Sequence, residues 1–325
     1  MPEALRVDNL YVSYRTQQGD VRALNGVSLV QQEGEVFCLV GESGAGKSTL
    51  ALAIMGLLPS NATLGGGSIY FEGVDLLRAD PEYVRGLRGR VISMVFQDAR
   101  SALNPVQLVG DQLEEVILEH TKVSARVANN MAQEMLREMG LPDPRHIMGQ
   151  YPFSLSGGMC QRVIMAIGLV LGPRLLLADE PTSGLDLTLQ AEMLELLRKL
   201  CRDQHASILL ITHDMGVVAT MAQQVGVLYA GTMVESAEVM PLFKRPQHPY
   251  TWALLQSLPR LDQPTKRLQP LPGTPPNMIN LPEECPFLPR CHKALTQCRV
   301  SRRPPLAEAE SGHLVACYNP VLPQD

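Results

Sequence analysis

A glycine-rich segment that ends in lysine and serine offers the clearest chemistry in this sequence. It runs from Gly41 to Ser48, after an apolar stretch and before one rich in Ala and Leu. Glycines let backbone N–H groups surround phosphate oxygens, and the N-terminus of a following helix adds partial positive charge. The lysine would hold the β- and γ-phosphates, and the serine hydroxyl would bind Mg²⁺. The predicted nucleotide-binding residues are Gly41, Ser43, Gly44, Gly46, Lys47, Ser48 and Thr49.

A second candidate element is an apolar stretch that ends in two carboxylates. Residues 175–178 are followed by Asp179 and Glu180. Carboxylates after a buried parallel strand lie at the carboxyl edge of its sheet, where a phosphate loop also lies. We expect Asp179 to hold Mg²⁺ and Glu180 to accept a proton from the attacking water. Alone the pair would indicate a solvated acidic turn, but downstream of a phosphate loop it favours nucleotide hydrolysis.

Short apolar runs alternate with helical patterns over the first 240 residues. Several runs are apolar throughout, which is typical of strands buried on both faces of a parallel or mixed sheet. Alternating strands and helices predict an α/β core. Strands are predicted at 35–40, 68–71, 91–96, 174–179, 207–212 and 225–230, and helices at 47–58, 124–139 and 188–204.

Composition excludes several classes of protein. The 325 residues are 45% hydrophobic and 19% charged, which predicts a folded protein with a large core. The net charge of −5 gives no reason to expect a nucleic-acid partner. The longest uncharged apolar run, 163–172, is too short to cross a bilayer, and the N-terminus lacks the pattern of a signal peptide. These features predict a cytoplasmic protein that is at most peripheral to a membrane.

The last 85 residues differ in composition from the rest. They hold 16 of the 25 prolines and four of the seven cysteines. Because proline fixes φ and removes a hydrogen-bond donor, we expect neither long helices nor central strands here. The change predicts two domains, 1–240 and 241–325.

Residues 155–162, which read Leu-Ser-Gly-Gly-Met-Cys-Gln-Arg, complete a recognisable set. They resemble the signature of the ATP-binding subunits of ABC transporters, which also carry the two phosphate motifs described above. The resemblance covers about residues 4–240 and implies a P-loop NTPase core with an antiparallel β part and a helical subdomain at about 98–172. It also implies a head-to-tail dimer, in which the signature of one subunit closes the ATP site of its partner. The signature residues assigned to ATP are Ser156, Gly157 and Gly158.

The same resemblance assigns further residues. Gln97 matches the glutamine that contacts Mg²⁺ and water, and His213 matches the histidine that touches the γ-phosphate. Tyr14 stands where the family stacks an aromatic ring on adenine, with Tyr11 as the alternative. Residues 183–186 resemble a loop that crosses between dimer partners. The residues assigned to catalysis are therefore Lys47, Gln97, Glu180 and His213.

The C-terminal region resembles the tail of ATPases from oligopeptide, dipeptide and nickel importers. Its cysteines, Cys285, Cys291, Cys298 and Cys317, are separated by five, six and 18 residues. These spacings lack the close pairs of structural zinc sites and suit an iron–sulfur cluster. The resemblance also implies a [4Fe–4S] cluster, with zinc and reduced thiols as the alternatives.

The most consistent hypothesis is an ATPase that powers uptake of peptides or related solutes, including nickel chelates. The resemblance implies two membrane permease subunits, docked after Gln97 through residue 116. It also implies a second ATPase subunit, as a heterodimer or alternatively a homodimer, and an external solute-binding protein. The expected location is the cytoplasmic face of the inner membrane. Three alternatives fit less well: a soluble ABC ATPase in a non-transport role, a P-loop kinase and a degenerate regulatory cassette. The sequence does not select the cargo.

Overall fold

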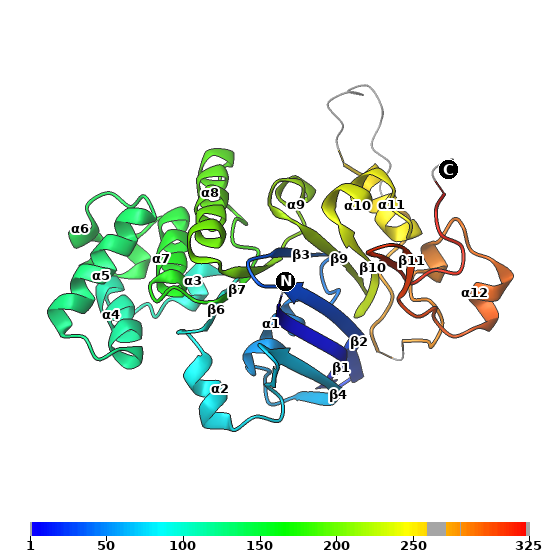
Figure 1. Cartoon of the computed structure of the whole chain (residues 1–325), viewed down its shortest axis with the longest axis horizontal. Coiled ribbons are helices and arrows are strands. Elements are labelled where there is room, and N and C mark those ends of the chain that lie inside the picture. Colours follow the sequence, from blue (N-terminus) through cyan, green and yellow to red (C-terminus); the bar gives the residue numbers. More distant parts are fainter. Residues whose placement is uncertain (1, 259–270, 280, 323–325) are drawn as a thin grey trace. The chain divides into compact units, whose positions relative to one another are not determined.

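The computed structural model describes residues 2–258, 271–279 and 281–322 (Figure 1). The predicted C-terminal domain, 241–325, is therefore described except for 259–270, 280 and 323–325. The chain divides into two compact units. The first unit comprises the described residues of Met1–Ala4, Gln31–Val36 and Arg78–Thr212, and the second those of Leu5–Val30, Phe37–Leu77 and His213–Asp325. The predicted boundary between residues 240 and 241 stays a prediction.

Parallel strands and helices make up the first unit. Strand β7 (Leu175–Asp179) pairs in parallel with β6 (Ile92–Val95) on one side and β8 (Ser207–Ile211) on the other. Every residue of β7 and β8 is buried, as expected for apolar strands covered on both faces. The helices of this unit are α2 (Pro81–Leu87), α3 (Ala99–Ala102), α4 (Val109–His120), α5 (Ala125–Glu138), α6 (Pro144–Met148), η1 (Pro152–Ser154), α7 (Gly157–Leu169) and α8 (Leu187–Gln204).

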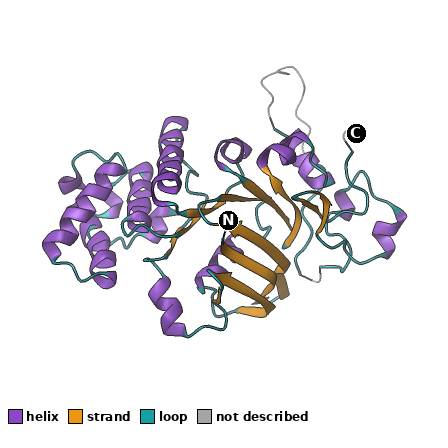
Figure 2. Cartoon of the chain, viewed as in Figure 1, coloured by secondary structure: helices purple, strands orange, loops and turns teal. Residues whose placement is uncertain are grey.

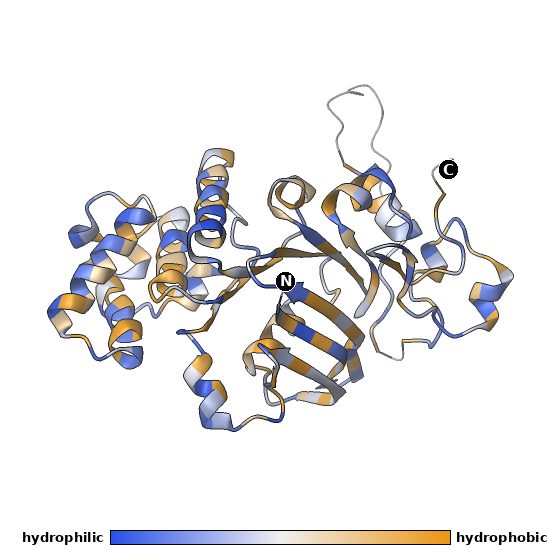
Figure 3. Ribbon diagram, in the orientation of Figure 1, coloured by the Kyte–Doolittle hydropathy of each residue, from blue (hydrophilic) through white to orange (hydrophobic). Residues whose placement is uncertain are grey.

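Helices α4 to α7 gather into one group in Figures 1 and 2. Their amphipathic sequences explain the packing: α5 buries Ala128, Ala132 and Leu136, which recur every four residues on one face. Figure 3 shows the resulting mixture of hydrophobic and hydrophilic residues along these helices. The helices from α3 to α7 fall within the expected subdomain at 98–172, whose limits stay a prediction.

The second unit contains antiparallel and mixed sheets. One sheet has the strand order β2-β1-β4-β5, and β1 pairs antiparallel with β4 from Leu5↔Phe71 to Tyr14↔Ala62. The other follows the order β11-β12-β10-β9-β3, with β3 parallel to β9 and β10 antiparallel to β9. The strands are β1 (Glu3–Thr16), β2 (Gly19–Gln32), β3 (Val36–Val40), β4 (Ala62–Phe71), β5 (Val74–Asp75), β9 (Gln224–Tyr229), β10 (Thr232–Glu238), β11 (Ala307–Glu310) and β12 (His313–Val315). The helices are α1 (Lys47–Met55), α9 (Met215–Met221), α10 (Val239–Lys244), α11 (Pro249–Gln256), η2 (Leu288–Arg290) and α12 (Thr296–Val300).

Residue patterns predicted the buried strands better than the half-buried ones. The 14-residue strands β1 and β2 were missed, because their residues alternate between buried and exposed and form no continuous apolar run. Figure 3 shows hydrophobic and hydrophilic residues alternating as bands along the strands. Helix α1 ends three residues before the predicted Leu58, since Gly56 adopts a left-handed φ of 62° and terminates it.

The proline-rich region forms short elements, as predicted, but one expectation was wrong. Among its described residues the longest helix is α11, with eight residues. Strand β12 lies between β10 and β11, although no central strand was expected. Its three residues, His313–Val315, contain no proline and supply the pairing groups on both sides. Within the described residues, no helix combines the length and hydropathy needed to cross a membrane.

A buried carboxylate connects these short elements. Glu235 on β10 has no solvent exposure and accepts hydrogen bonds from the backbone N–H groups of Gln247 (2.7 Å) and His248 (2.9 Å). Its side chain also lies 2.7 Å from Nε2 of His313 on β12. Nδ1 of His248 accepts the N–H of Tyr250 and so caps α11. Burial lowers the pKa of His248 to about 4, because the charged ring would lose its hydration here, and the nearby carboxylate of Glu235 only partly opposes this effect.

The depressed pKa of His248 predicts an acid-sensitive fold. The ring is neutral in the folded state but takes up a proton near pH 6.5 when unfolded, so its stabilising contribution is complete above pH 6.5 and is lost as pH falls toward 4. Between about pH 7.5 and pH 4.5, the wild type should lose about 2–3 kcal/mol more unfolding free energy than His248→Asn, which keeps a capping acceptor. Urea denaturation at both pH values measures this difference. His205→Asn, at an exposed histidine, serves as the control; identical pH dependence of His248→Asn and wild type would contradict the assignment.

Candidate active site

The predicted phosphate loop connects β3 to α1 in the second unit and folds around its lysine. Nζ of Lys47 donates to the carbonyl oxygens of Gly41 (2.8 Å) and Glu42 (3.0 Å), and the lysine is 7% exposed. Ser43, Gly44 and Ser48 remain exposed. The loop therefore folds around the ammonium group of Lys47. Its outer surface and the N-terminal end of α1 face solvent. This is the arrangement that binds polyphosphate.

Close packing makes two of the loop glycines irreplaceable by larger residues. A Cβ on Gly41 would lie 2.2 Å from the carbonyl oxygen of Leu228, and one on Gly46 would lie 2.3 Å from that of Ala23. Both glycines have positive φ, 157° and 104°. Gly44 also has a positive φ, 77°, but a Cβ there would meet nothing within 4 Å. The loop thus lies directly against the backbone of β2 and β9.

Tyr14, and not Tyr11, contacts the helix that follows the loop. The hydroxyl of Tyr14 donates to Oγ1 of Thr49 at 3.1 Å. The hydroxyl of Tyr11 instead lies so close to Gly26 that a Cβ there would be 2.9 Å away. His213 is exposed just before α9, whose first turn is capped by the carboxylate of Asp214. The second unit thus carries the loop, Tyr14 and His213.

In the first unit, two of the predicted catalytic side chains meet. Nε2 of Gln97 donates to Oε2 of Glu180 at 3.0 Å. Asp179 is buried at the end of β7, and the chain then turns sharply at Glu180, which has a left-handed φ of 48°. The N–H of Glu180 donates to the carbonyl of Ile211. A non-glycine residue with positive φ is costly and persists where its surroundings fix it, which is common at functional sites.

The signature segment begins α7 with its first residues exposed. Oγ of Ser156 accepts the N–H of Met159 at 3.3 Å and caps the helix, while Ser156 and Gly157 are open to solvent. Nε2 of Gln161 donates to the carbonyl of Pro181 at 2.8 Å, which links α7 to the turn after Glu180. The predicted ATP-binding face of the signature is therefore available to a ligand or a second chain.

The four C-terminal cysteines lie near one another without forming a coordination shell. Burial raises the pKa of Cys285 to about 11 and that of Cys317 to about 12, and the charges of the neighbouring cysteines add to both increases. The N–H of Asn319 donates to Sγ of Cys317 at 3.3 Å. Within the described residues, no three His, Cys, Asp or Glu side chains are grouped closely enough to hold a metal ion. The predicted iron–sulfur site thus has suitable donors, but the structure does not support it as a formed site.

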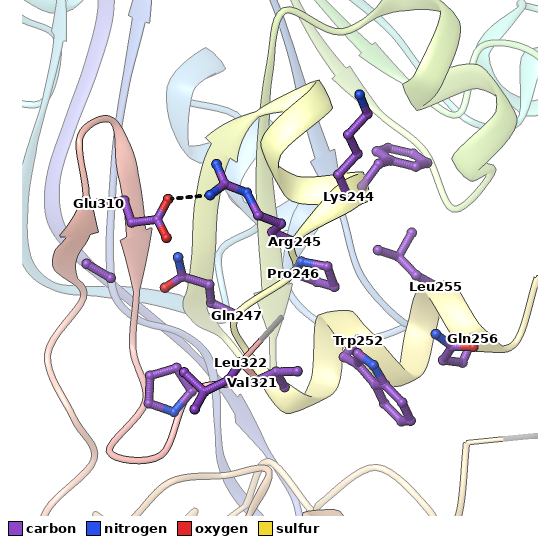
Figure 4. Close-up of a pocket in the computed structure, with 13 residues that line it drawn as sticks. Lys244, Arg245, Pro246, Gln247, Trp252, Leu255, Gln256, Glu310, Val321 and Leu322 are labelled. Carbon is purple, nitrogen blue, oxygen red and sulfur yellow. Dashed lines mark ion pairs between the residues drawn. The ribbon is translucent and has the colours of Figure 1, made fainter. Parts of the chain in front are cut away.

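Some residues around the loop gave no signal in the sequence. Tyr229, Tyr250 and Arg290 contact Glu42 or one another beside the phosphate loop. Glu42 occupies a variable position of the motif, and its partners lie up to 248 residues away along the chain. A separate cavity of about 360 Å³ lies between α10, α11 and the last described residues (Figure 4). Trp252 and Leu255 line it, and Arg245 forms an ion pair with Glu310 at its rim.

Known proteins resemble this chain along nearly its whole length. A dipeptide transport ATP-binding protein of Bacillus subtilis (strain 168), DppD, is 46% identical and covers 98% of this chain and 95% of its own. The chain belongs to the ABC transporter family of ATP-binding proteins. An oligopeptide transport ATP-binding protein of Salmonella typhimurium, OppD, is 43% identical and covers 98% of this chain and 94% of its own.

Family and structure comparisons agree with this assignment. Residues 24–183 match the family described as ABC transporter, and residues 234–298 match the C-terminal region of oligopeptide/dipeptide transporters. The dimeric ATP-binding cassette MJ0796, solved with ADP and Pi, superposes with a TM-score of 0.66 at 26% identity over 72% of this chain and 98% of its own. The cassette cbiO1 from Clostridium perfringens gives a TM-score of 0.62 at 26% identity, over 75% of this chain and 91% of its own. The predicted ABC ATPase fold is therefore confirmed.

The packing of the loop predicts different outcomes for two alanine substitutions in this ABC protein. Gly41→Ala places a methyl group against the Leu228 carbonyl, so the loop must move, and we expect ATP affinity to fall at least about tenfold. Gly44→Ala is the control: it adds left-handed strain of about 1–2 kcal/mol but meets no neighbouring atom, and affinity should fall less. Titration with a fluorescent ATP analogue measures both. Equal losses would contradict the steric argument.

Proposed function

We propose that this ABC ATPase hydrolyses ATP to drive import of peptides through separate membrane subunits. The observation that carries the proposal is the combination, in one chain, of the ABC motifs with the C-terminal region of oligopeptide/dipeptide transporters. The relatives named above, a dipeptide and an oligopeptide transport ATP-binding protein, point to the same cargo class. None of them favours a soluble ATPase in a non-transport role. Nickel chelates remain the second candidate cargo, from the resemblance of the tail.

The proposed reaction depends mainly on positioning and on charge. Lys47 and the loop N–H groups bind the phosphates, and Tyr14 supports the adenine. Bound Mg²⁺, held by Ser48, Gln97 and Asp179, would neutralise phosphate charge. Glu180 accepts the proton of the attacking water, and its hydrogen bond with Gln97 orients the carboxylate for this step. His213 completes the γ-phosphate side.

A second ATPase subunit completes the site in this proposal. Ser156, Gly157 and Gly158 begin α7 with an exposed hydroxyl, an exposed N-terminal turn and no bulky side chain. Such a helix start binds an anion, and here it would meet the γ-phosphate held by the partner's loop. The MJ0796 cassette is described as a dimer. We propose a head-to-tail heterodimer with a similar ATPase, and a homodimer as the alternative.

Exposed apolar side chains support docking to permease subunits. Val106 is 82% exposed and Phe153 is 75% exposed, and the ring of Phe153 stacks on that of Tyr151 at 5.4 Å. The N–H of Val109 donates to the carbonyl of Gln150, so the chain just after Val106 meets the chain just before Tyr151. Apolar patches of this kind mark contact surfaces. We propose that two permeases dock here, that the subunit is peripheral at the cytoplasmic face of the inner membrane, and that a solute-binding protein delivers the cargo outside.

We also propose that Cys285, Cys291, Cys298 and Cys317 hold a [4Fe–4S] cluster. Four thiols in one region, near enough for Cys317 to interact with the charges of the other three, and an N–H···S hydrogen bond support this proposal, although the thiols are not grouped as a formed site in the described part of the chain. When bound, the cluster would act as a structural link between four points of a chain too rich in proline to build its own core. Binding requires thiolates, so the raised pKa values imply that cluster assembly displaces protons.

The role of Glu180 can be separated from nucleotide binding. Glu180→Gln keeps the shape of the side chain but cannot accept the proton, so ATP should still bind while the turnover rate falls by about 10²–10⁴-fold. Steady-state phosphate release and ATP titration measure the two properties. Glu195→Gln, on the exposed side of α8, is the control and should behave as wild type.

The same variant tests transport. Cells that carry Glu180→Gln in place of the wild-type subunit should lose uptake of radiolabelled di- and oligopeptides, and cells with Glu195→Gln should keep it. Rapid ATP hydrolysis by Glu180→Gln would show that Glu180 does not accept the proton of the attacking water. Normal peptide uptake without ATP hydrolysis would show that this subunit does not drive peptide import.

Anaerobic purification tests the cluster. We expect about four irons and four sulfides per chain and a broad absorption band near about 400 nm. Replacing Cys291 with serine should remove most of the iron, whereas Cys201→Ser, outside the C-terminal region, should not. One zinc per chain would make the tail a zinc site, and the absence of both metals would leave four reduced thiols.

A further inference from the structure

The C-terminal region reaches the phosphate loop through one buried arginine. Arg290 ends the short helix η2, and its side chain is 4% exposed. Its Nη1 donates to Oε2 of Glu42 at 2.7 Å, and its Nη2 donates to Oε1 at 2.9 Å. Glu42 is the second residue of the phosphate loop. Two parallel hydrogen bonds between a guanidinium and a carboxylate fix both groups in angle as well as in distance.

Other contacts fix the position of the Arg290 side chain. Its Nε donates to the carbonyl of Pro272 at 2.8 Å, and its Nη1 also donates to the hydroxyl of Tyr229 at 3.1 Å. The guanidinium lies 5.8 Å from the ring centre of Tyr229 and 5.9 Å from that of Phe287. The arginine therefore has little freedom to leave Glu42.

A second contact holds the backbone of the same loop residue. The N–H of Glu42 donates to the hydroxyl of Tyr250 at 3.0 Å. Tyr250 is fully buried, and its ring packs against those of Tyr229 at 4.6 Å and Phe287 at 5.4 Å. Both the side chain and the N–H of Glu42 are thus held by residues that follow β9.

We propose that Arg290 is a positioning residue for ATP binding, which makes the C-terminal region part of the nucleotide site. Glu42 puts a negative charge into a loop that must bind a polyanion. With only 25% of its side chain exposed, this charge would be weakly screened by water and would repel the phosphates. Arg290 neutralises it and fixes the start of the loop. The inference rests on ATP binding by this loop, as in the proposed function.

A double-mutant cycle tests the proposal. Arg290→Met leaves the Glu42 carboxylate uncompensated, so the Kd for ATP should rise about tenfold or more, while kcat at saturating ATP changes less than about threefold. Glu42→Gln removes the charge but keeps one oxygen that can accept a hydrogen bond from Arg290, so its Kd for ATP should rise less than that of Arg290→Met. The double variant Glu42→Gln/Arg290→Met should bind ATP more tightly than Arg290→Met alone, because the uncompensated charge is gone, but less tightly than wild type, because the loop has lost its hydrogen bonds. Isothermal titration and steady-state ATPase assays on the full chain measure these values.

Two further variants separate positioning from simple stability. Arg303→Met breaks another contact of the C-terminal region, a 3.0 Å hydrogen bond to Thr232, and should leave the Kd unchanged. Arg290→Gln replaces Arg290→Met if the latter does not fold, with the same expected outcomes.

Normal ATP affinity of the Arg290 variant would overturn the proposal, and so would a double variant as weak as the single one. Failure of the wild type to bind ATP would instead refute the proposed function itself.

Discussion

The structure depends on how the phosphate loop is fixed, because this glycine-rich segment has few side chains that could fix its shape. A phosphate loop binds through backbone N–H groups while the chain turns tightly, so its shape must be fixed largely by its surroundings. The neighbouring backbone supplies the constraint. Gly41 lies against Leu228, Gly46 lies against Ala23, and the N–H of Gly231 donates to the carbonyl of Ala45. The β-strands on either side therefore determine the loop, and the lysine bonded to its carbonyls closes it.

In the first unit, the turn at Glu180 is likewise fixed by neighbouring backbone and side-chain contacts. Glu180 follows a fully buried strand and adopts a strained backbone, which the N–H···O bond to Ile211 and the bond from Gln161 to Pro181 fix on either side. The signature helix and the proposed catalytic carboxylate are thus parts of one hydrogen-bonded arrangement. A shift of α7 would be transmitted to Glu180, which gives a physical route from dimer contact to hydrolysis.

The sequence predicted what depends on fixed local spacing. The phosphate loop, the strand before Asp179 and the signature each need neighbouring residues in a set order, and the structure forms β3, β7 and α7 where these motifs lie. Strands β1 and β2 were missed because half-buried antiparallel strands carry no continuous apolar run. The pair of Arg290 and Glu42 has no local pattern, since it joins residues 248 apart, and tertiary packing alone brings them together.

The proline-rich region is better understood as part of the ATPase than as an appendage. Its described residues belong to the same compact unit as the phosphate loop. Short elements cannot stabilise themselves, so they pack on what the rest of this unit offers: Phe287 sits edge-on to Tyr229 of β9, and β12 pairs with β10. Cys285 and Cys291 bracket the turn that carries Phe287 and Arg290, with N–H···O bonds from Leu288 to Cys285 and from Cys291 to Leu288. Whatever fixes the cysteines also fixes Arg290, and through it the loop that binds ATP. The proline-rich region and the phosphate loop are therefore coupled through the contact of Arg290 with Glu42, although they lie far apart in the sequence.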